Sequence, residues 1–257
     1  MEVFLNPSAW IALLTLTFLE IVLGIDNIIF ISIATGKLPA EKRKRATKIG
    51  MFLAMFMRIA LLMGISVLIA MKEPWYSFNF SWFSAQITGQ SLILLFGGLF
   101  LLYKSTSEIR EKVEEKGQEE KELGKSATKS FSNVIFQIIL IDIVFSFDSI
   151  LTAVGMTNGV EGALYIMVTA VVISVLIMMQ FAVPVGLFVN KHPSIQILGL
   201  TFLVLIGFML ITESAHLANA LFFGTHVDAV PKGYLYFAIS FSLLVEVLNM
   251  KMAKNKK

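Results

Sequence analysis

The sequence predicts an all-α polytopic membrane protein with seven transmembrane helices, because of its composition and the length of its apolar runs. Of 257 residues, 56% are hydrophobic and 15% are charged, and the mean hydropathy is +0.79. Soluble chains average about 45–50% apolar and about 25% charged residues. Several apolar runs reach the roughly 20 residues that span a bilayer. This composition excludes a secreted disulfide scaffold, a disordered chain and a cytosolic enzyme, and the absence of cysteine excludes thiolate metal sites.

Seven spans follow from the hydropathy pattern. They cover about residues 9–35, 49–71, 87–103, 133–156, 162–189, 196–214 and 233–250. We expect them to form a single transmembrane domain over residues 1–257. The segment 104–132 mixes lysine and arginine with glutamate, which is typical of a solvated cytoplasmic loop or of a helical extension of the third span. Whether this loop is a plain linker or binds a partner is left open.

The basic residues predict how the chain crosses the membrane. Of the 21 lysines and arginines, 18 lie in the segments 36–48, 104–132, 190–195 and after residue 250, all on one side of the membrane if the spans alternate. Basic loops stay on the cytoplasmic side. We therefore expect the N-terminus outside and the C-terminus inside, and we interpret the basic loops as topology signals, with no nucleic-acid partner.

An internal duplication divides the chain into two related parts. Residues 19–28 reappear as residues 141–150, an offset of 122 positions, and the segment around Arg58 matches the segment around Gln180 at the same offset. The copies comprise about residues 9–103 and 133–214, and the helix at about 233–250 lies outside them. Each copy holds three spans, an odd number, so the second copy must enter the bilayer in the opposite orientation. Such inverted repeats place a transporter's substrate site near the midplane.

Four acidic residues lie in the first span of the two copies, namely Glu20, Asp26, Asp142 and Asp148. A charged group in the bilayer interior costs between about 3 and well over 10 kcal/mol, depending on how it is measured. These acids must therefore line a water-accessible cavity, pair with a cation or hold protons. Asn27 and Ser149, next to two of the acids, add neutral oxygens.

Helix geometry leaves two ways to bring the acids together. Glu20 and Asp26 differ by about 120° in azimuth and by about 9 Å along a helix axis, so a straight helix does not aim both at one ion. Either the first helix opens near Gly24 and Asn27, or each acid meets its counterpart from the other copy. Both arrangements predict a carboxylate cluster that holds a metal ion.

The residue types select the ion. Neither histidine nor cysteine lies beside the four acids in the sequence, and oxygen ligands favour hard cations such as Mn²⁺, Mg²⁺ or Ca²⁺. We expect Arg58, within the second span, to balance part of the charge by lying beside an acid. Crowded carboxylates hold protons when no cation is bound, so protons are a candidate coupling ion.

Three further residues form a candidate secondary or access site. Glu213 and His216 are spaced i, i+3 near the outer end of the sixth span, a spacing that can place two ligands on one metal. Glu246 lies near the inner end of the seventh span. An interfacial acid, a surface histidine and a snorkelling glutamate explain the same pattern.

The two acidic segments, together with Arg58 and the mixed-charge loop, resemble the TerC family of integral membrane proteins. The resemblance covers nearly the whole chain and rests on the paired motifs at residues 19–28 and 141–150. It implies a seven-helix inverted-repeat fold in the bacterial inner (cytoplasmic) membrane, an association with tellurite resistance, and a role in metal homeostasis, with manganese export in several members. The family's acidic positions map onto Glu20, Asp26, Asp142 and Asp148.

Three classes of function remain in view. An exporter of a divalent metal ion, with Mn²⁺ as the leading substrate, explains the duplication and the buried acids, and it is not an enzyme and needs no organic cofactor. A non-transporting membrane scaffold or assembly partner is the alternative, because a fold does not determine a function. An intramembrane aspartyl protease using Asp26 and Asp148 is a remote alternative. The number of ions, the transport direction and the oligomeric state are left open.

Overall fold

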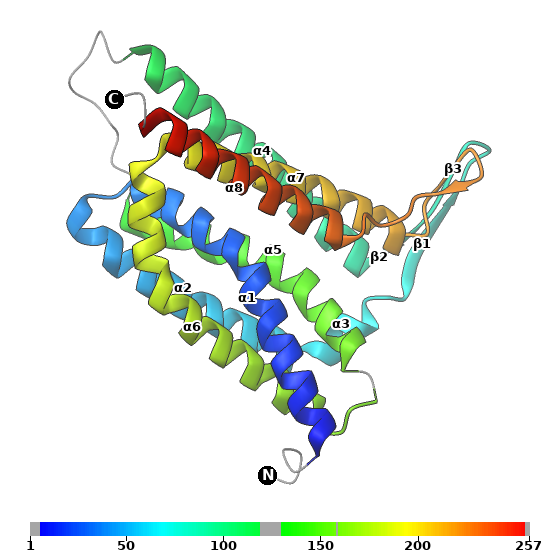
Figure 1. Ribbon diagram of the computed structural model, residues 1–257. Coiled ribbons are helices and arrows are strands. Elements are labelled where there is room, and N and C mark those ends of the chain that lie inside the picture. Colours follow the sequence, from blue (N-terminus) through cyan, green and yellow to red (C-terminus); the bar gives the residue numbers. More distant parts are fainter. Residues whose placement is uncertain (1–5, 119–129, 158, 255–257) are drawn as a thin grey trace. The chain divides into compact units, whose positions relative to one another are not determined.

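The computed structural model describes residues 6–118, 130–157 and 159–254 (Figure 1). Within these residues, seven helices are long and apolar enough to cross a membrane. They are α1 (Pro7–Gly36), α2 (Ala40–Met63), α4 (Gly89–Gln118), α5 (Phe131–Met156), α6 (Ala163–Lys191), α7 (Pro193–Leu217) and α8 (Lys232–Lys254). The number and order of the predicted spans are thus confirmed.

Several helix ends follow from local sequence signals. The Asn6 side chain accepts a hydrogen bond from the Ser8 N–H at 3.1 Å, and Pro7 occupies the first position of α1. This pairing satisfies an N–H that helix geometry leaves without a partner, and proline needs none there. The second predicted span is interrupted at Gly64, which separates α2 from the short helix α3 (Ile65–Ala70). The helix of the third span continues through residue 118, and the rest of the expected charged loop, residues 119–129, lies outside the described residues.

The chain packs as two compact units, each described here by itself. Unit 1 comprises Met1–Ala70 and Ser126–Asn190 and holds α1, α2, α3, α5 and α6. In this unit α2 packs along α5, and α1 contacts both. Gly50 of α2 allows the close approach, because a Cβ there would lie 2.9 Å from the Ile138 side chain of α5. Helices α1 and α5 run in opposite directions (Figure 1).

Unit 2 comprises Met71–Lys125 and Lys191–Lys257 and holds α4, α7 and α8. Helices α4 and α7 form its most extensive contact. A Cβ built on Gly98 would lie 2.6 Å from the main-chain oxygen of Gly207, so the two backbones touch where neither residue has a side chain. Small residues that let backbones approach are a general basis of helix packing in membranes.

Unit 2 also carries a small antiparallel sheet that the prediction of an all-α fold missed. Its order is β1 (Pro74–Asn79), β2 (Phe83–Thr88), β3 (Leu221–Phe222) and β4 (Thr225–His226). Half of the residues in the two strands of the first hairpin are aromatic or β-branched, and these residue types favour strands. The second hairpin turns at Phe223 and Gly224 with φ values of 49° and 79°, the left-handed conformation of a two-residue type I′ turn.

The two units cut across the sequence duplication. The first two spans of each copy, α1 with α2 and α5 with α6, lie in unit 1, whereas the third spans, α4 and α7, lie in unit 2. The opposite directions of α1 and α5 are what an inverted repeat requires. The inverted symmetry of the complete copies and the orientation of the termini stay predictions.

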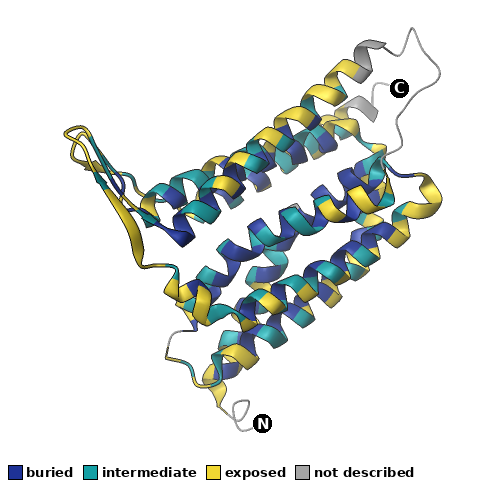
Figure 2. Ribbon diagram, turned by 180° about the vertical axis from the view of Figure 1, so that it is seen from behind, coloured by how far each residue is buried: buried dark blue, intermediate teal, exposed yellow. Residues whose placement is uncertain are grey.

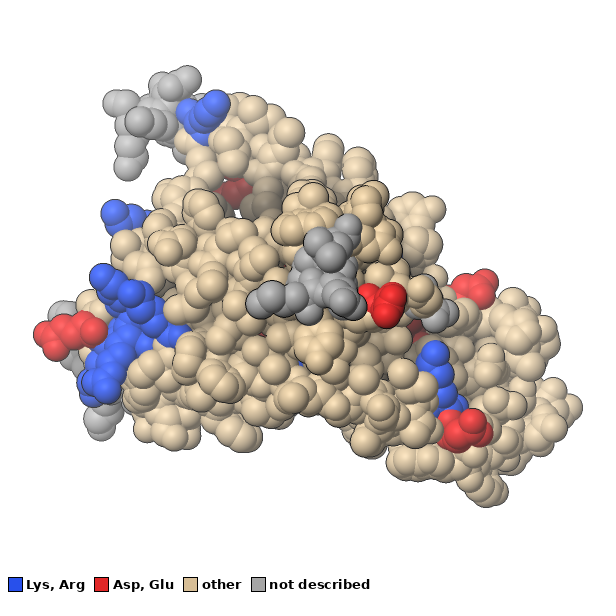
Figure 3. Space-filling view, turned by 90° about the horizontal axis from the view of Figure 1, so that it is seen from below, with Lys and Arg blue, Asp and Glu red and all other residues tan. Residues whose placement is uncertain are grey.

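Apolar side chains cover the outward faces of the spans. Figure 2 shows buried residues where the helices of a unit face one another and exposed residues on the other sides. Exposed positions include Phe18, Met63 and Phe237, each about 70% accessible. In the view of Figure 3, lysine and arginine gather toward one side, and most of the remaining face is uncharged. Such a surface suits a hydrocarbon solvent.

Candidate ion-binding site

Two acids predicted to bind metal lie buried on facing helices of unit 1. Glu20 of α1 is 3% exposed and Asp142 of α5 is 7% exposed. Helix α1 is continuous from Pro7 to Gly36, so it does not open near Gly24 and Asn27. Glu20 and Asp142, which occupy equivalent positions of the two copies, instead bind the same guanidinium.

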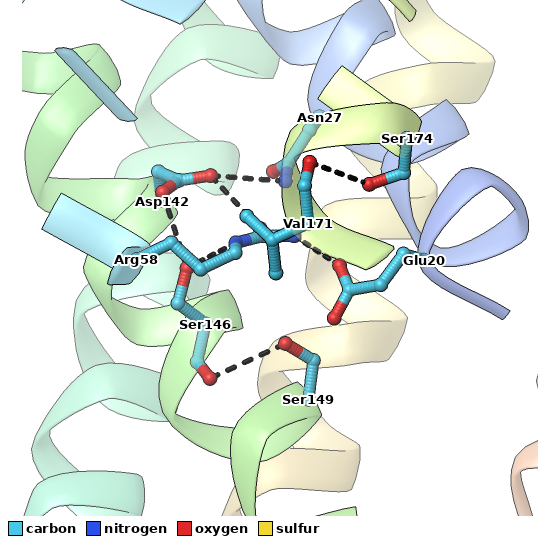
Figure 4. Close-up of polar contacts among 8 residues, drawn as sticks. All are labelled: Glu20, Asn27, Arg58, Asp142, Ser146, Ser149, Val171 and Ser174. Carbon is cyan, nitrogen blue, oxygen red and sulfur yellow. Dashed lines mark hydrogen bonds and ion pairs between the residues drawn. The ribbon is translucent and has the colours of Figure 1, made fainter. Parts of the chain in front are cut away.

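Arg58 of α2 joins the two acids (Figure 4). Its Nη1 forms an ion pair with Oε2 of Glu20, and its Nη2 donates to Oδ1 of Asp142 at 3.1 Å. The Nε donates to the Ser146 hydroxyl of α5 at 2.9 Å. Arg58 is 4% exposed, so this guanidinium is almost completely removed from solvent.

Neutral polar groups complete the coordination of Asp142. Asn27 of α1 donates from Nδ2 to Oδ1 of Asp142 at 3.3 Å, and the Ser146 hydroxyl donates to Oδ2 at 3.1 Å. Asn27 lies seven residues after Glu20 and therefore returns to nearly the same helix face. Ser149 is buried one turn beyond Ser146, and its hydroxyl donates to the main-chain oxygen of Ser146 at 3.3 Å.

The charges of this cluster do not cancel. Two carboxylates face one guanidinium, which leaves one formal negative charge when both acids are ionised. Removing charges from water costs several kcal/mol per ion, and a buried ion pair offsets this cost only when its contacts are close and well oriented. The site therefore favours an additional positive charge.

A cavity of about 20 Å³ adjoins Asp142, Asn27 and Arg58. It lies among helices of unit 1, and its walls come from four of them. The lining residues are Gly24, Asn27, Ile28, Ile31, Met51, Ala54, Met55, Arg58, Asp142, Val175 and Met178. A space of this size holds about one water-sized particle.

The remaining predicted acids are placed differently. Asp148 is half-buried on α5, six residues beyond Asp142. The backbone of Asp26 is part of α1, but its side chain lies outside the described residues. In the part of the chain that the structure describes, no three acidic or histidine side chains form a metal-binding group. The described centre is thus the Glu20, Asp142 and Arg58 cluster.

The candidate access residues belong to unit 2. Glu213 is half-buried and His216 is exposed near the end of α7, and Glu246 is half-buried on α8. Gln180, which occupies the position equivalent to Arg58, is exposed on α6. The two copies therefore contribute unequally to the cluster, because the single guanidinium comes from the first.

Sequence reasoning missed Ser146 and the methionines that line the cavity. Ser146 occupies the position equivalent to Gly24, and the difference between the two copies at this position was the available signal. The methionines carry no such signal, since no sequence pattern separates a thioether beside a cavity from one that packs in a core or faces lipid.

Comparisons with known proteins agree on one family. The family model described as "Integral membrane protein TerC family" matches residues 5–257. The UPF0053 inner membrane protein YgdQ of Escherichia coli K12 is 48% identical over 252 residues, covering 98% of this chain and 96% of that protein. A UPF0053 protein of Haemophilus influenzae is 44% identical, covering 98% of each. No solved structure was found to match.

A longer relative contains the same region. The UPF0053 inner membrane protein YoaE of Escherichia coli K12 is 43% identical over 258 residues, which is 99% of this chain but 45% of that protein. None of these names indicates a catalytic activity. With its family match and its seven candidate spans, the chain belongs to the TerC family of integral membrane proteins and is a multi-pass protein of the inner membrane.

Proposed function

We propose that the protein is a transporter that exports a divalent metal ion, with Mn²⁺ as its substrate and Ca²⁺ and Mg²⁺ as the alternative ions. The observation that carries this proposal is the approach of Glu20 and Asp142, two buried acids from different spans, to a single guanidinium. Ionisable groups inside membrane helices are costly and are typical of ion pathways.

Arg58 has the role of a resident cation in this proposal. It occupies the carboxylate oxygens that a metal ion would need, so binding requires Arg58 to release Asp142, Glu20 or both. The guanidinium returns when the ion leaves, which avoids two unpaired buried carboxylates. Competition between a tethered and a mobile cation thus keeps the site occupied by positive charge throughout a transport cycle.

The choice of ion rests on the donor atoms. Asp142 offers carboxylate oxygens and Asn27 an amide oxygen beside the cavity, and such oxygens suit Mn²⁺, Mg²⁺ and Ca²⁺. Asp26 and Asp148 are proposed to complete the oxygen set during transport. The outward direction and the cellular role in metal homeostasis are inferred from the family resemblance.

Protons are the proposed exchange partner. A carboxylate that loses its cation in a poorly hydrated site is stabilised by protonation. Arg58 offsets one of the two negative charges of the described pair, and in this proposal an exchanged proton offsets the other while no metal ion is bound.

The test is Mn²⁺ flux in proteoliposomes that contain the purified protein. Wild type should transport Mn²⁺, and Asp142→Asn and Glu20→Gln should reduce the rate at least tenfold. Asp228→Asn and Glu161→Gln make the same chemical changes at exposed residues and should leave the rate unchanged. Absence of flux in every variant would favour the non-transporting scaffold.

A pH gradient tests proton exchange in the same vesicles. An opposing proton gradient should accelerate Mn²⁺ export and should drive it against a Mn²⁺ gradient. A Mn²⁺ flux that is independent of the pH gradient would contradict proton coupling but not transport itself.

A further inference from the structure

Methionine side chains form part of the wall of the cavity next to Asp142. Three of its lining residues are methionines, Met51 and Met55 from α2 and Met178 from α6. Met178 is 5% exposed, so its thioether is held inside unit 1. The oxygen donors Asp142 and Asn27 line the same space. The wall of this cavity thus combines residues that carry oxygen donors with residues that carry thioethers.

Gly24 brings the Met178 sulfur close to the acidic helix. A Cβ built on Gly24 would lie 2.0 Å from the Met178 Sδ, so the sulfur occupies the space that any side chain at residue 24 would fill. Residue 24 is one turn after Glu20 and one turn before Asn27 on α1. Because Gly24 has no side chain, the Met178 thioether fits against α1 between the positions of Glu20 and Asn27.

The small volume makes these contacts decisive for the type of ion. A cavity of about 20 Å³ has room for about one water-sized particle, so an ion there has lost most of its hydration shell. Mg²⁺ gives up water reluctantly and demands octahedral oxygen ligands, and Ca²⁺ takes six to eight oxygens. Oxygen is the main donor for all three ions, but Mn²⁺ is the softest of them, so a polarizable thioether is a poor ligand for Mg²⁺ and Ca²⁺ and a better one for Mn²⁺.

We propose that Met178, seated against Gly24, selects Mn²⁺ over Mg²⁺ and Ca²⁺ at the Asp142 site. This inference rests on the proposed function, since it assigns the specificity of that same site. The carboxylate supplies most of the affinity for any divalent ion, and the thioether lowers the relative affinity for ions that require oxygen alone.

Equilibrium binding of Mn²⁺ to the purified protein, with Mg²⁺ and Ca²⁺ as competitors, tests the inference without measuring transport. Met178→Leu nearly conserves volume and removes only the sulfur. It should lower the ratio of Mn²⁺ to Ca²⁺ affinity by about tenfold, which corresponds to about 1.4 kcal/mol. Gly24→Ala, which displaces the sulfur by steric contact, should change the ratio in the same direction. Met63→Leu makes the same substitution at a residue that is 74% exposed and should have no effect.

The variants separate the two proposals. Unchanged ion preference in both Met178→Leu and Gly24→Ala, with Mn²⁺ binding lost in Asp142→Asn, would overturn the role of Met178 and leave the carboxylate site standing. Mn²⁺ binding that is absent from wild type, or equal in wild type and Asp142→Asn, would overturn the proposed function and this inference with it.

Discussion

Replacing Arg58 by glutamine removes the cation that joins the two buried acids. The Arg58 guanidinium contacts Glu20, Asp142 and Ser146, and all four residues are less than 10% exposed. Glutamine keeps polar atoms at this position but carries no charge. Glu20 and Asp142 would then be two buried carboxylates that have lost the guanidinium with which both pair, on helices that pack against each other.

The size of the effect follows from this burial. Breaking a buried ion pair by removing one partner costs about 3–5 kcal/mol, because the other partner stays desolvated. Whole proteins are stable by about 5–15 kcal/mol, so Arg58→Gln should remove a large part of the total. With 1.36 kcal/mol for each factor of ten, the ratio of folded to unfolded protein should fall by roughly two to four orders of magnitude.

The assay is reversible denaturant unfolding of the purified protein in bicelles, compared between variants. Arg45→Gln on the same helix is the matched control, because Arg45 is exposed and its replacement should change the free energy of unfolding by less than about 0.5 kcal/mol. Equal stability of Arg58→Gln and Arg45→Gln would refute the reasoning.

A rescue experiment separates charge from packing. Adding Glu20→Gln and Asp142→Asn to Arg58→Gln removes all three charges and should recover most of the lost stability. Mn²⁺ should stabilise Arg58→Gln more than wild type, since the competing guanidinium is gone and ligand binding raises the stability of the folded state. Failure of both rescues would assign the destabilisation to packing around the Arg58 side chain.

Two further predictions concern unit 2. Gly98→Ala should destabilise the α4 and α7 pair by about 1–3 kcal/mol, because its Cβ would collide with the Gly207 backbone. Gly233→Ala is the control and should be neutral or stabilising, because a Cβ there has no neighbour within 4 Å. Thermal unfolding of both variants measures the difference in stability. Phe223→Asn should leave stability unchanged or raise it by up to about 1 kcal/mol, because Phe223 is 83% exposed and has a φ of 49°, which asparagine adopts more easily. Phe222→Asn should lower stability, because it removes the ring contact with Phe83. Hydrogen exchange of the second hairpin compares the two variants.

The spans were predictable because hydrocarbon selects for length and apolarity. The first span, expected over about residues 9–35, is the helix Pro7–Gly36, and the fourth, expected from about 133, begins at Phe131. Helix α2 begins at Ala40, nine residues before the predicted span. Its first turns contain charged residues, and a hydropathy pattern does not detect a helix made of charged residues. A hydropathy pattern therefore predicts the apolar part of a span but not the ends of its helix.

The sheet was missed because its strands are short and its aromatic residues have a second interpretation. Trp75, Tyr76 and Trp82 fit an aromatic belt at the membrane interface equally well. Pairing between β2 and β3 joins Phe83 to Phe222 across more than a hundred residues, and no local pattern indicates such a contact.

The sequence identified the acids, but it could not determine which of them meet. Duplication and the cost of buried charge made Glu20, Asp142 and Arg58 candidate site residues, and the structure places Arg58 in contact with both acids. The division of each copy between two units depends on packing of whole helices, which a span-by-span pattern does not contain. The approach of Met178 to Gly24 likewise depends on how α6 lies against α1.

Mn²⁺ binding by electron paramagnetic resonance tests the central claim most directly, because the signal of the free hydrated ion falls as the protein binds it. Wild type should remove Mn²⁺ saturably, and the double variant Glu20→Gln, Asp142→Asn should not, while the exposed pair Glu161→Gln, Asp228→Asn should bind as wild type does. Equal binding by the two double variants would contradict the claim that the buried carboxylates of α1 and α5 hold the ion.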